Sequence, residues 1–528
     1  MIGMMQAWPL TVDRILDHAA DRHGRREVVT RSLEGPIVRT SYAEVRRRAK
    51  QVSNALLAMG VRPGDRVATL ATTTARHLEV WYGIMGIGAV CHTLNPRLHP
   101  DQICWIINHA EDRVIFADAP FAPLLRERAD QAPTVQRIVT LDEDYEELIA
   151  GQSEACAWGD FDENTACGLC YTSGTTGDPK GVVYSHRSNF LHTLMCLQPD
   201  VIGFSASDTV LPVAPMFHAN AWGVAFTAPA VGAKLVMPGA KLDGASIHEL
   251  LETEGVTVSC AVPTVWTGLL QYLDQTGAKL TTLKRVAIGG SACPEAIIRG
   301  FQERHGVEVR HLWGMTETSP VATSGALSSG LAARPFEEQL PTRLKQGRAQ
   351  LGCEMKITDD AGRRLPEDGA TFGRLKVRGP IVSSGYFKGV GDILDEEGFF
   401  DTGDVATIDP EGVMHITDRA KDVIKSGGEW ISSVEIETLA MSHPKAAIAA
   451  VIGVPHPKWE ERPLLLVKLK DGEACSREEM LGHLHGKIAK WWTPDEVLFV
   501  DDIPLGATGK IDKKVIRAAY AGYRLPTA

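Results

Sequence analysis

The stretch TSYAEVRRRAKQVSNALLAMGVRPGDRVATLA, residues 40–71, contains the pattern that decides the fold. Ser41 and Glu44 make a capping box, and the apolar residues after them recur at helical spacing. Gly60 ends this helix, and DRVATLA, residues 65–71, predicts a strand. Because helix and strand alternate in this way along most of the chain, we expect an α/β fold whose largely parallel, twisted sheets carry helices on both faces.

The later part of the chain predicts a division into domains. Residues 351–416 alternate short strands such as GRLKVRGP with turns such as DDAG, which indicates a small β-barrel or meander. The charged, glycine-rich segment DRAKDVIKSGG follows, and helix and strand alternate again after it. We predict an N-terminal domain of residues 1–417, with two doubly wound sheet subdomains and the small barrel. A hinge linker of residues 418–423 and a small, mobile α+β domain of residues 424–528 complete the chain.

Composition narrows the class of protein. A chain of 528 residues suggests roughly three or four structural units, and 23% charged with 44% hydrophobic residues is ordinary for a globular protein. The net charge of −11, without a sustained Lys/Arg block, argues against a nucleic-acid partner. The ten cysteines are scattered, and no basic residue precedes the first apolar stretch, so we expect a reducing, cytoplasmic location.

One uncharged stretch could be mistaken for a membrane span. Residues 209–233 contain no Asp, Glu, Lys or Arg. Pro212, Pro215 and Pro229 interrupt the stretch, and His218 lies within it. We therefore expect buried core or a ligand wall here, and no integral membrane segment.

A second stretch, YTSGTTGDPKG at residues 171–181, indicates phosphate binding. Its glycines allow close approach of the backbone to an anion, its hydroxyl groups donate hydrogen bonds, and its lysine adds a charge. Pro179 before Lys180 and Gly181 after it do not match the loop of kinases and GTPases, in which Lys follows Gly directly. An ordinary Gly/Ser/Thr turn is the alternative.

Four further stretches, AIGGSACP, HLWGMTETSP, FFDTGDVATID and IPLGATGKIDKK, add the rest of a nucleotide site. The first two place a glycine after a probable strand, where open α/β sheets bind ligands. Trp313 offers a flat face for a base, and Glu317 offers an oxygen ligand for Mg²⁺. Asp404, which we place in a turn, can accept hydrogen bonds from ribose hydroxyls, and Lys510 presents a charge near the chain end. Each alone has a structural explanation, but their joint occurrence favours a nucleotide site.

On these motifs the sequence resembles the acyl-adenylate-forming superfamily of acyl-CoA synthetases, nonribosomal adenylation domains and firefly-type luciferases, over about residues 40–517. Trp313 stands where tyrosine is commoner, and Leu505 and Gly506 replace a commoner basic residue and threonine. The resemblance implies an ATP and AMP site made of Thr172, Ser173, Gly174, Thr175, Thr176, Gly177, Lys180, Gly289, Gly290, Ser291, Trp313, Gly314, Met315, Thr316, Asp404 and Arg419.

The implied chemistry explains these residue types. A carboxylate must be activated before a thiol can attack it, so its oxygen displaces pyrophosphate from ATP and gives an acyl-adenylate. Mg²⁺, held by Glu317 and Thr172, and the catalytic Lys510 would neutralise the anions that meet in this step. The thiol of coenzyme A then displaces AMP, and the resemblance implies that Lys425 serves this step.

The branch of the family follows from a few residues. No aspartate stands in APMFHANAWG to pair with an amino acid, and no carrier domain follows the lysine loop, which favours a free carboxylic acid and soluble CoA. The segments LPVAPMFHANAWG, NPRLHP and GGEWISS resemble medium- and long-chain fatty acyl-CoA synthetases of bacteria, including relatives that act on 3-methylthiopropionate. This branch implies a homodimer, an acyl gate at His218 and Trp222, CoA contacts at Gly427, Gly428 and Trp430, and a hinge at Lys421.

Several alternatives stay open at this point. The acid could be 3-methylthiopropionate or another short or aryl acid. A luciferase-like oxygenase shares the same motifs, and light or oxygen uptake with an adenylated luciferin distinguishes it. An inactive nucleotide sensor is the non-enzyme alternative, and the retained Glu317, Lys425 and Lys510 count against it.

Overall fold

The structure is a computed structural model that describes all residues except 2, 173–177, 390, 428 and 507–510. Contacts divide the chain into two compact units. The first comprises Met1–Glu354 and Arg378–Phe400, and the second comprises Met355–Val377 and Asp401–Ala528. The domain boundaries at residues 417 and 423 stay a prediction, and each unit is described by itself below.

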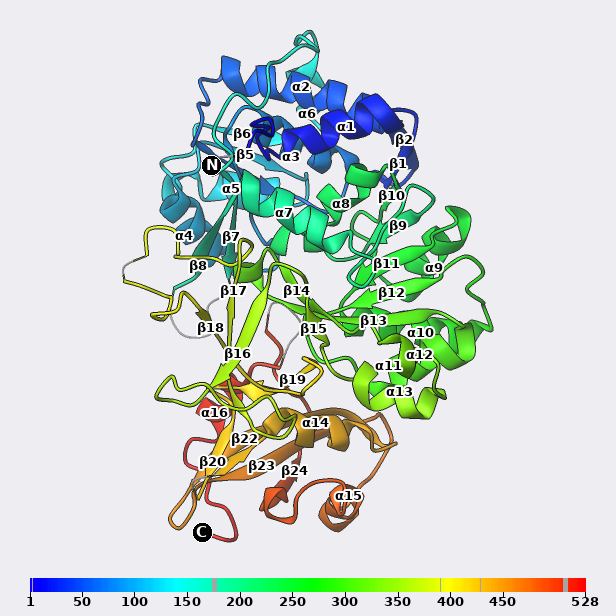
Figure 1. Ribbon diagram of the computed structural model, residues 1–528, viewed down its shortest axis with the longest axis vertical. Coiled ribbons are helices and arrows are strands. Elements are labelled where there is room, and N and C mark those ends of the chain that lie inside the picture. Colours follow the sequence, from blue (N-terminus) through cyan, green and yellow to red (C-terminus); the bar gives the residue numbers. More distant parts are fainter. Residues whose placement is uncertain (2, 173–177, 390, 428, 507–510) are drawn as a thin grey trace. The chain divides into compact units, whose positions relative to one another are not determined.

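A nine-stranded sheet forms one half of the first unit (Figure 1). Its six central strands are parallel, and antiparallel strands lie at both edges. The order is β15 (Arg348–Ala349), β14 (Val321–Ser324), β13 (Glu308–Gly314), β12 (Arg285–Ile288), β11 (Val258–Ala261), β9 (Thr209–Pro212), β10 (Lys234–Met237), β1 (Glu27–Arg31) and β2 (Ile37–Ser41).

A six-stranded sheet forms the other half of this unit. Five strands are parallel, and β8 pairs antiparallel with β7 to close one edge. The order is β6 (Arg137–Thr140), β5 (Val114–Ala117), β3 (Arg66–Leu70), β4 (Val90–Thr93), β7 (Ala166–Thr172) and β8 (Lys180–Ser185). Two mainly parallel sheets confirm the predicted α/β class.

Helices connect these strands. The predicted helix is confirmed as α2 (Tyr42–Ala58), whose N-cap Ser41 accepts a hydrogen bond from the N–H of Glu44 at 3.4 Å. Gly60, with φ +80°, follows its end. The others are α1 (Asp13–His23), α3 (Ala75–Gly86), α4 (Pro100–Ala110), α5 (Ala122–Glu127), α6 (Tyr145–Ile149), α7 (His186–Cys196), α8 (Val224–Val231), α9 (Gly244–Thr253), α10 (Pro263–Thr276), α11 (Glu295–Arg299), α12 (Ser329–Ala332) and α13 (Phe336–Arg343), with short turns η1 (Ala129–Gln131), η2 (Ala219–Gly223), η3 (Gly300–Arg304) and η4 (Thr316–Thr318).

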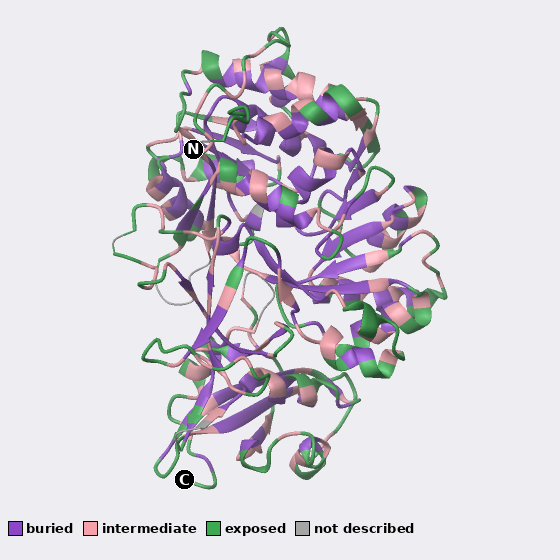
Figure 2. Cartoon of the chain, viewed as in Figure 1, coloured by how far each residue is buried: buried purple, intermediate pink, exposed green. Residues whose placement is uncertain are grey.

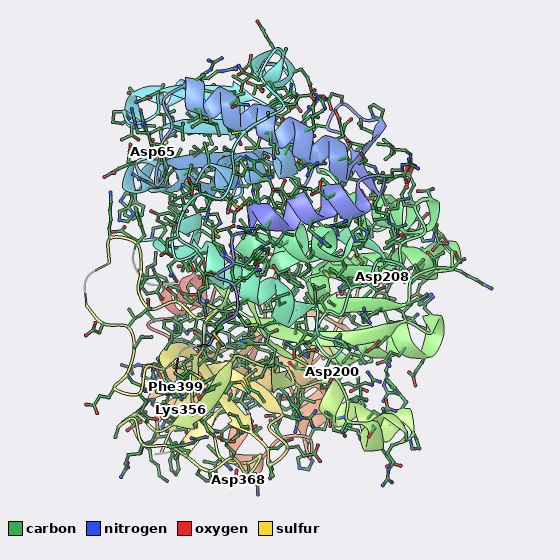
Figure 3. The ribbon with its side chains drawn as sticks, turned by 45° about the horizontal axis from the view of Figure 1, so that its top comes forward. Asp65, Asp200, Asp208, Lys356, Asp368 and Phe399 are labelled. Carbon is green, nitrogen blue, oxygen red and sulfur yellow. The ribbon has the colours of Figure 1, made fainter. Side chains whose placement is uncertain are left out.

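Buried apolar side chains hold the sheets and helices together, and Figure 2 shows the strands mostly as buried. Most apolar residues of the uncharged stretch 209–233 pack into one large core cluster, and Leu211 and Val213 pack into a second, as predicted for buried core or a ligand wall. Asp208, just before this stretch (Figure 3), accepts hydrogen bonds from the N–H of Ser205 at 2.8 Å and the hydroxyl of Thr257 at 2.7 Å. Although burial opposes ionisation, these bonds hold the pKa of Asp208 below its ordinary value.

The second unit contains two sheets. A four-stranded meander of β16 (Glu354–Thr358), β17 (Gly373–Arg378), β18 (Phe400–Ile408) and β19 (Met414–Arg419) occupies the region where a barrel or meander was expected. The other sheet has the order β21 (Glu429–Ile431), β20 (Ile424–Ser426), β23 (Glu460–Leu469) and β22 (Ala446–His456), with β24 (Glu496–Phe499) beside β23. Its helices are α14 (Ser433–Met441), α15 (Arg477–Leu484) and α16 (Lys513–Ala519), with the short turn η5 (Lys490–Trp492).

Candidate active site

A β-hairpin carries the predicted phosphate loop. Strand β7 ends at Thr172, β8 begins at Lys180, and these two residues are cross-strand partners. Kinase-type loops connect a strand to a helix, so the hairpin gives a structural reason why this loop departs from their pattern. Ser173, Gly174, Thr175, Thr176 and Gly177 lie outside the described residues.

The two glycine turns of the first unit follow neighbouring parallel strands, β12 and β13. Gly289 comes directly after β12, and a Cβ there would meet the carbonyl oxygen of Leu312 at 3.0 Å. Gly290 has a φ angle of +83°, and a residue with a side chain would adopt this backbone conformation only with strain. The predicted Ser291 follows in the same turn and is exposed, whereas Trp313 in β13 is buried. Gly314 ends β13.

Glu317 is a buried carboxylate in η4, which also contains Thr316 and directly follows Met315. Its Oε1 accepts a hydrogen bond from the hydroxyl of Tyr386 at 2.8 Å, and its backbone carbonyl accepts one from the N–H of Ser383 at 2.8 Å. Burial and the nearby carboxylate raise the pKa of Tyr386, so the phenol stays protonated and donates this bond. Glu317 and Tyr386 line a cleft of about 370 Å³ together with residues 182–185 and 380–385.

Tyr386 also contacts the predicted phosphate lysine. The Nζ of Lys180 lies 4.8 Å from the centroid of the Tyr386 ring, a cation–π distance. The next residue, Phe387, donates its N–H to the carbonyl of Gly181 at 2.8 Å. A single tyrosine thus contacts both the end of the phosphate loop and the predicted metal ligand.

The predicted acyl gate has an unusual backbone. Ala219, Ala221 and Trp222 all have left-handed φ angles, of 43°, 50° and 55°. Trp222 is only 6% exposed, and its ring would be 3.4 Å from a Cβ placed on Gly289. The gate segment η2 therefore packs its tryptophan against the first glycine turn, while His218, at its N-cap, is half-buried.

In the second unit, the two predicted ribose ligands form an ion pair. Asp404 Oδ1 lies 2.8 Å from Nε of Arg419, and the two residues are cross-strand partners in β18 and β19. The expectation that Asp404 lies in a turn is wrong, because β18 continues through it to Ile408. The TGD pattern suggested a turn, but Gly403 takes its φ of +71° within the strand.

The predicted hinge is a four-residue turn between β19 and β20. The N–H groups of Asp422 and Val423 both donate to the carbonyl of Arg419, at 2.9 and 2.8 Å. Lys421 is exposed at the turn, and its neighbour Asp422 pairs with Arg517 at 2.7 Å. Desolvation by the neighbouring chain, together with the positive charges of Arg419 and Arg517, lowers the pKa of Lys421.

A buried cluster of charges fixes the residues around this turn. Asp418 accepts a 2.5 Å hydrogen bond from the N–H of Ser433. Lys513, the first residue of α16, donates to the hydroxyl of Ser433 at 2.6 Å and pairs with Glu437 at 2.8 Å. Burial opposes the charge on Lys513, but Glu437 and Asp418 raise its pKa. The cluster connects the end of β19 to the helix that follows the lysine loop.

Lys510 itself lies outside the described residues, but both ends of its loop are fixed. Leu505 and Ile511 form an isolated β-bridge, and the N–H of Asp512 donates to the carbonyl of Pro504 at 2.8 Å. The side chain of Asp512 caps α16 by accepting from the N–H groups of Lys514 and Val515. The loop therefore begins and ends at ordered backbone contacts.

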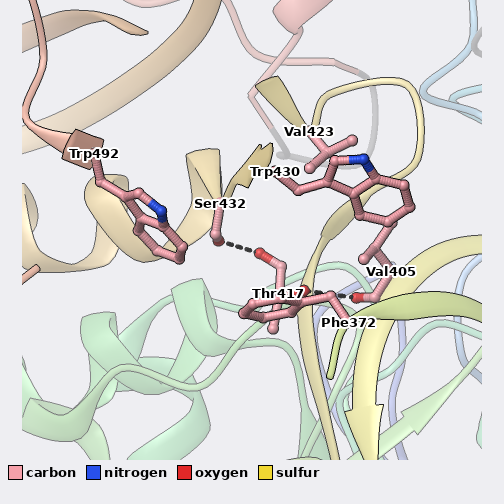
Figure 4. A pocket seen from close by; sticks show the side chains of 7 residues that line it. All are labelled: Phe372, Val405, Thr417, Val423, Trp430, Ser432 and Trp492. Atoms are coloured by element: carbon pink, nitrogen blue, oxygen red, sulfur yellow. Dashed lines mark hydrogen bonds between the residues drawn. The ribbon is translucent and has the colours of Figure 1, made fainter. Parts of the chain in front are cut away.

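Of the predicted CoA residues, Gly427 and Trp430 are described and Gly428 is not. Gly427 has φ +63° and donates its N–H to the carbonyl of Trp459 at 2.9 Å. Trp430 lines a small apolar cleft around Thr417, whose carbonyl accepts from the hydroxyl of Ser432 (Figure 4). Lys425, the cross-strand partner of Trp430, lies with Nζ 3.4 Å from Asp360 Oδ2.

Sequence reasoning missed two residues that organise these groups. Tyr386 lies in SSGYFKG, a polar loop without periodicity, and a single sequence gives no signal for its contacts with Glu317 and Lys180. Lys513 was not singled out among the lysines of GKIDKK, because burial of a lysine by distant acids leaves no local signal.

Comparison with known proteins identifies the class. The family model of AMP-binding enzymes matches residues 16–387, and the model of the AMP-binding enzyme C-terminal domain matches residues 435–510. The chain therefore belongs to the AMP-binding enzyme family.

Individual relatives narrow the class. The chain is 49% identical to a 3-methylmercaptopropionyl-CoA ligase of Ruegeria lacuscaerulensis, over 98% of this chain and 99% of that one. It is 46% identical to a medium-chain fatty acid–CoA ligase of Ectopseudomonas oleovorans, over 98% of both chains. The ATP-bound crystal structure of MatB from Rhodopseudomonas palustris superposes with a TM-score of 0.83 at 27% identity, over 97% of this chain and 99% of that one. The protein is an AMP-forming acyl-CoA synthetase that uses ATP and CoA.

The helices give no indication of a membrane span. Within the part of the chain that the structure describes, none is both long and apolar enough to cross a bilayer.

Proposed function

We propose that the protein activates a fatty acid of medium to long chain, and transfers it to CoA through an acyl-adenylate. The observation that supports a fatty acid is the uncharged stretch of residues 209–233, which forms a wall around the gate segment η2. Residues 209–233 contain no charged side chain, and Trp222 packs in the same core as Met216 and Val224. Such a wall accepts an apolar tail and offers no oppositely charged Asp, Glu, Lys or Arg to an amine or a second carboxylate.

Two relatives support different acids. The 49% identical relative is named for 3-methylmercaptopropionate, a short thioether acid, and the 46% identical one for medium-chain fatty acids. Both tails are apolar, so the same wall suits either acid. We therefore retain 3-methylmercaptopropionate, or another short or aryl acid, as the second candidate.

In the first step, a carboxylate oxygen of the acid attacks the α-phosphorus of ATP, and the bond to pyrophosphate breaks. Lys510 and Lys180 would place positive charge beside the meeting anions. The oxygens of Glu317 and Thr172 are donors that suit Mg²⁺, which would screen the phosphate charges when bound. Asp404 and Arg419 would hold the ribose. In the second step, the CoA thiol loses its proton to solvent, its sulfur attacks the acyl carbon, and AMP leaves with the electron pair of the anhydride bond.

A substrate panel tests the choice of acid. The purified full-length protein is assayed for AMP formation with acids from 3-methylmercaptopropionate through butyrate and octanoate to palmitate. A maximum of kcat/KM at octanoate or longer supports the proposal. A maximum at the thioether acid, at butyrate, or at benzoate added to the panel as an aryl acid replaces it with the second candidate. Absence of AMP formation with every acid of the panel contradicts both.

We also propose a homodimer with a mobile C-terminal domain. Light scattering of the purified protein should give twice the chain mass of 57.3 kDa. A mass of one chain at micromolar concentration would contradict the dimer.

Tyr386→Phe should weaken the use of Mg²⁺. The variant keeps the ring that faces Lys180 but loses the hydrogen bond to Glu317. A hydrogen bond to a charged group contributes about 1.5–3 kcal/mol, so the Mg²⁺ concentration for half-maximal adenylation should rise about tenfold. The KM for the acid should change less than twofold.

Tyr184→Phe is the matched control for this prediction. Its hydroxyl donates to the backbone carbonyl of Thr316 at 2.8 Å, next to Glu317 but not to its carboxylate. We expect a smaller effect on Mg²⁺ use from the control. Equal effects of the two variants would show that Tyr386 acts through general packing.

Trp222→Ala should change the preference for chain length. Removing a buried indole at the gate opens space on the acyl side, so the ratio of kcat/KM for long over short acids should change about tenfold or more. The KM for ATP should stay within twofold.

Trp158→Ala serves as the control, because Trp158 packs between α2 and α3 and donates to the hydroxyl of Ser53 at 2.9 Å. Its loss should affect thermal stability and leave the chain-length preference unchanged. A change in ATP KM without a change in acid preference would contradict the gate.

A further inference from the structure

A cluster of metal-ligating side chains lies in the second unit, apart from the residues assigned to ATP, the acid and CoA. His443 follows the end of α14, and Cys475 precedes Ser476, the N-cap of α15. Glu479 lies in the first turn of α15. Within the described part of the chain, these three residues are the only group of His, Cys, Asp and Glu side chains placed to share an ion.

The distances in the cluster are short. One ligand atom from each of the three residues lies within 4.8 Å of the others, and Nε2 of His443 is 3.6 Å from Oε1 of Glu479. A fourth candidate, His483, stands four residues after Glu479 and therefore on the same face of α15. Its ring centroid lies 4.9 Å from that of His443.

Sulfur, nitrogen and oxygen donors in this combination select zinc among the common biological cations. Zinc binds such ligands at about 2.0–2.3 Å, so the ligand atoms must approach one another by roughly an ångström. Glu479 is exposed and Cys475 is half-buried, so both side chains can rotate. We propose that His443, Cys475 and Glu479 bind a zinc ion, with His483 as the fourth ligand.

Zinc must displace contacts that the side chains of this cluster make in the structure. Lys445 places Nζ 2.7 Å from Glu479, and its backbone N–H donates to Nδ1 of His443 at 3.3 Å. Binding through Nε2 requires the ring proton on Nδ1, so this long hydrogen bond is given up. The hydroxyl of Ser442 lies 2.9 Å from Nε2 of His483 and must release it. A thiolate and a carboxylate together neutralise the charge of Zn²⁺. The ammonium of Lys445 therefore competes with zinc for the carboxylate of Glu479.

Cobalt reports on such a site directly. The full-length protein is freed of metal with a chelator and titrated with Co²⁺, and Zn²⁺ is then added. We expect a saturable thiolate-to-cobalt absorption band in the near ultraviolet, with visible bands of tetrahedral intensity, and loss of both on addition of Zn²⁺. Cys475→Ser should remove the ultraviolet band. Glu479→Gln and His443→Ala should each weaken Zn²⁺ binding more than about 100-fold, above the cost of losing a supporting hydrogen bond.

Two control variants distinguish zinc binding at this cluster from binding elsewhere and from a general effect on the fold. Cys156 is the other cysteine that is not buried, so Cys156→Ser should leave the cobalt band unchanged. Lys445→Ala should strengthen Zn²⁺ binding several-fold, because it removes the competing cation, whereas a variant that merely loosened the fold would weaken binding. Circular dichroism confirms that each variant is folded. Absence of saturable binding, a band that survives Cys475→Ser, or weaker binding by folded Lys445→Ala would each overturn the proposal.

Discussion

Lys510→Ala is expected to reduce adenylate formation by about 10²-fold or more, while thioester formation from a presynthesised acyl-adenylate stays within about twofold. In the first half-reaction the carboxylate and the α-phosphate are both anionic, and the lysine would lie between them. In the second, a thiol attacks an acyl carbon that is already activated, so this charge is not needed. Pyrophosphate release and acyl-CoA formation measure the two steps separately.

Lys514→Ala is the matched control for this experiment. Lys514 is an exposed lysine in the first turn of α16, four residues after Lys510. Its replacement removes the same charge from the same region, and both half-reactions should stay within twofold. Equal loss of both steps in Lys510→Ala would show that this lysine supports the fold of the loop instead of the chemistry.

Lys421→Pro is expected to retain adenylate formation and to lose most acyl-CoA formation. If the same lysine loop occupies the site in the first step, the predicted mobile domain of residues 424–528 must move before CoA can enter. Proline fixes φ near −65° and restricts the residue before it, so a turn that must change its φ cannot do so. Acyl-adenylate should accumulate on the variant, and a chemical quench followed by chromatography measures it directly.

The turn itself should tolerate this proline. The hydrogen bonds that form it use the N–H groups of Ala420, Asp422 and Val423, and proline at 421 removes none of these three. Lys421→Ala is the control, because it removes the side chain and leaves the backbone free to rotate, so both steps should persist. If Lys421→Pro keeps both rates, or loses both together, the pivot lies elsewhere in the chain.

Much of the fold could be predicted because it depends on local patterns. The cap at Ser41, the helix after it and the strand β3 all follow from neighbouring residues. The alternation of helix and strand predicted after the charged, glycine-rich segment is confirmed by α14, β22, β23 and α15, and it too depends on local patterns. Asp404 was placed in a turn because TGD is a turn pattern, and pairing with β19 overrides that preference.

The residues of the candidate site were predictable from the sequence, but the side chains that hold them in position were not. Glu317 was found from a motif, yet the tyrosine that donates to it comes from residue 386, far along the chain. Lys513, Asp418 and Glu437 likewise meet only through the tertiary fold. No single sequence records such partnerships, because each depends on how separate segments pack.

The left-handed residues of the gate segment carry a thermodynamic consequence. A non-glycine residue in this region costs roughly 1–2 kcal/mol, and Ala219, Ala221 and Trp222 each occupy it. Any conformer in which all three regain ordinary φ angles is thus favoured by several kcal/mol of released strain, which offsets the burial lost by the indole. If the predicted gate opens, the free-energy difference between its packed and open conformers would be the difference between these two terms. Glycine at position 221 would then cancel part of the strain and favour the packed form. An acid that needs the open gate would bind more weakly, although none of the residues that touch it is changed.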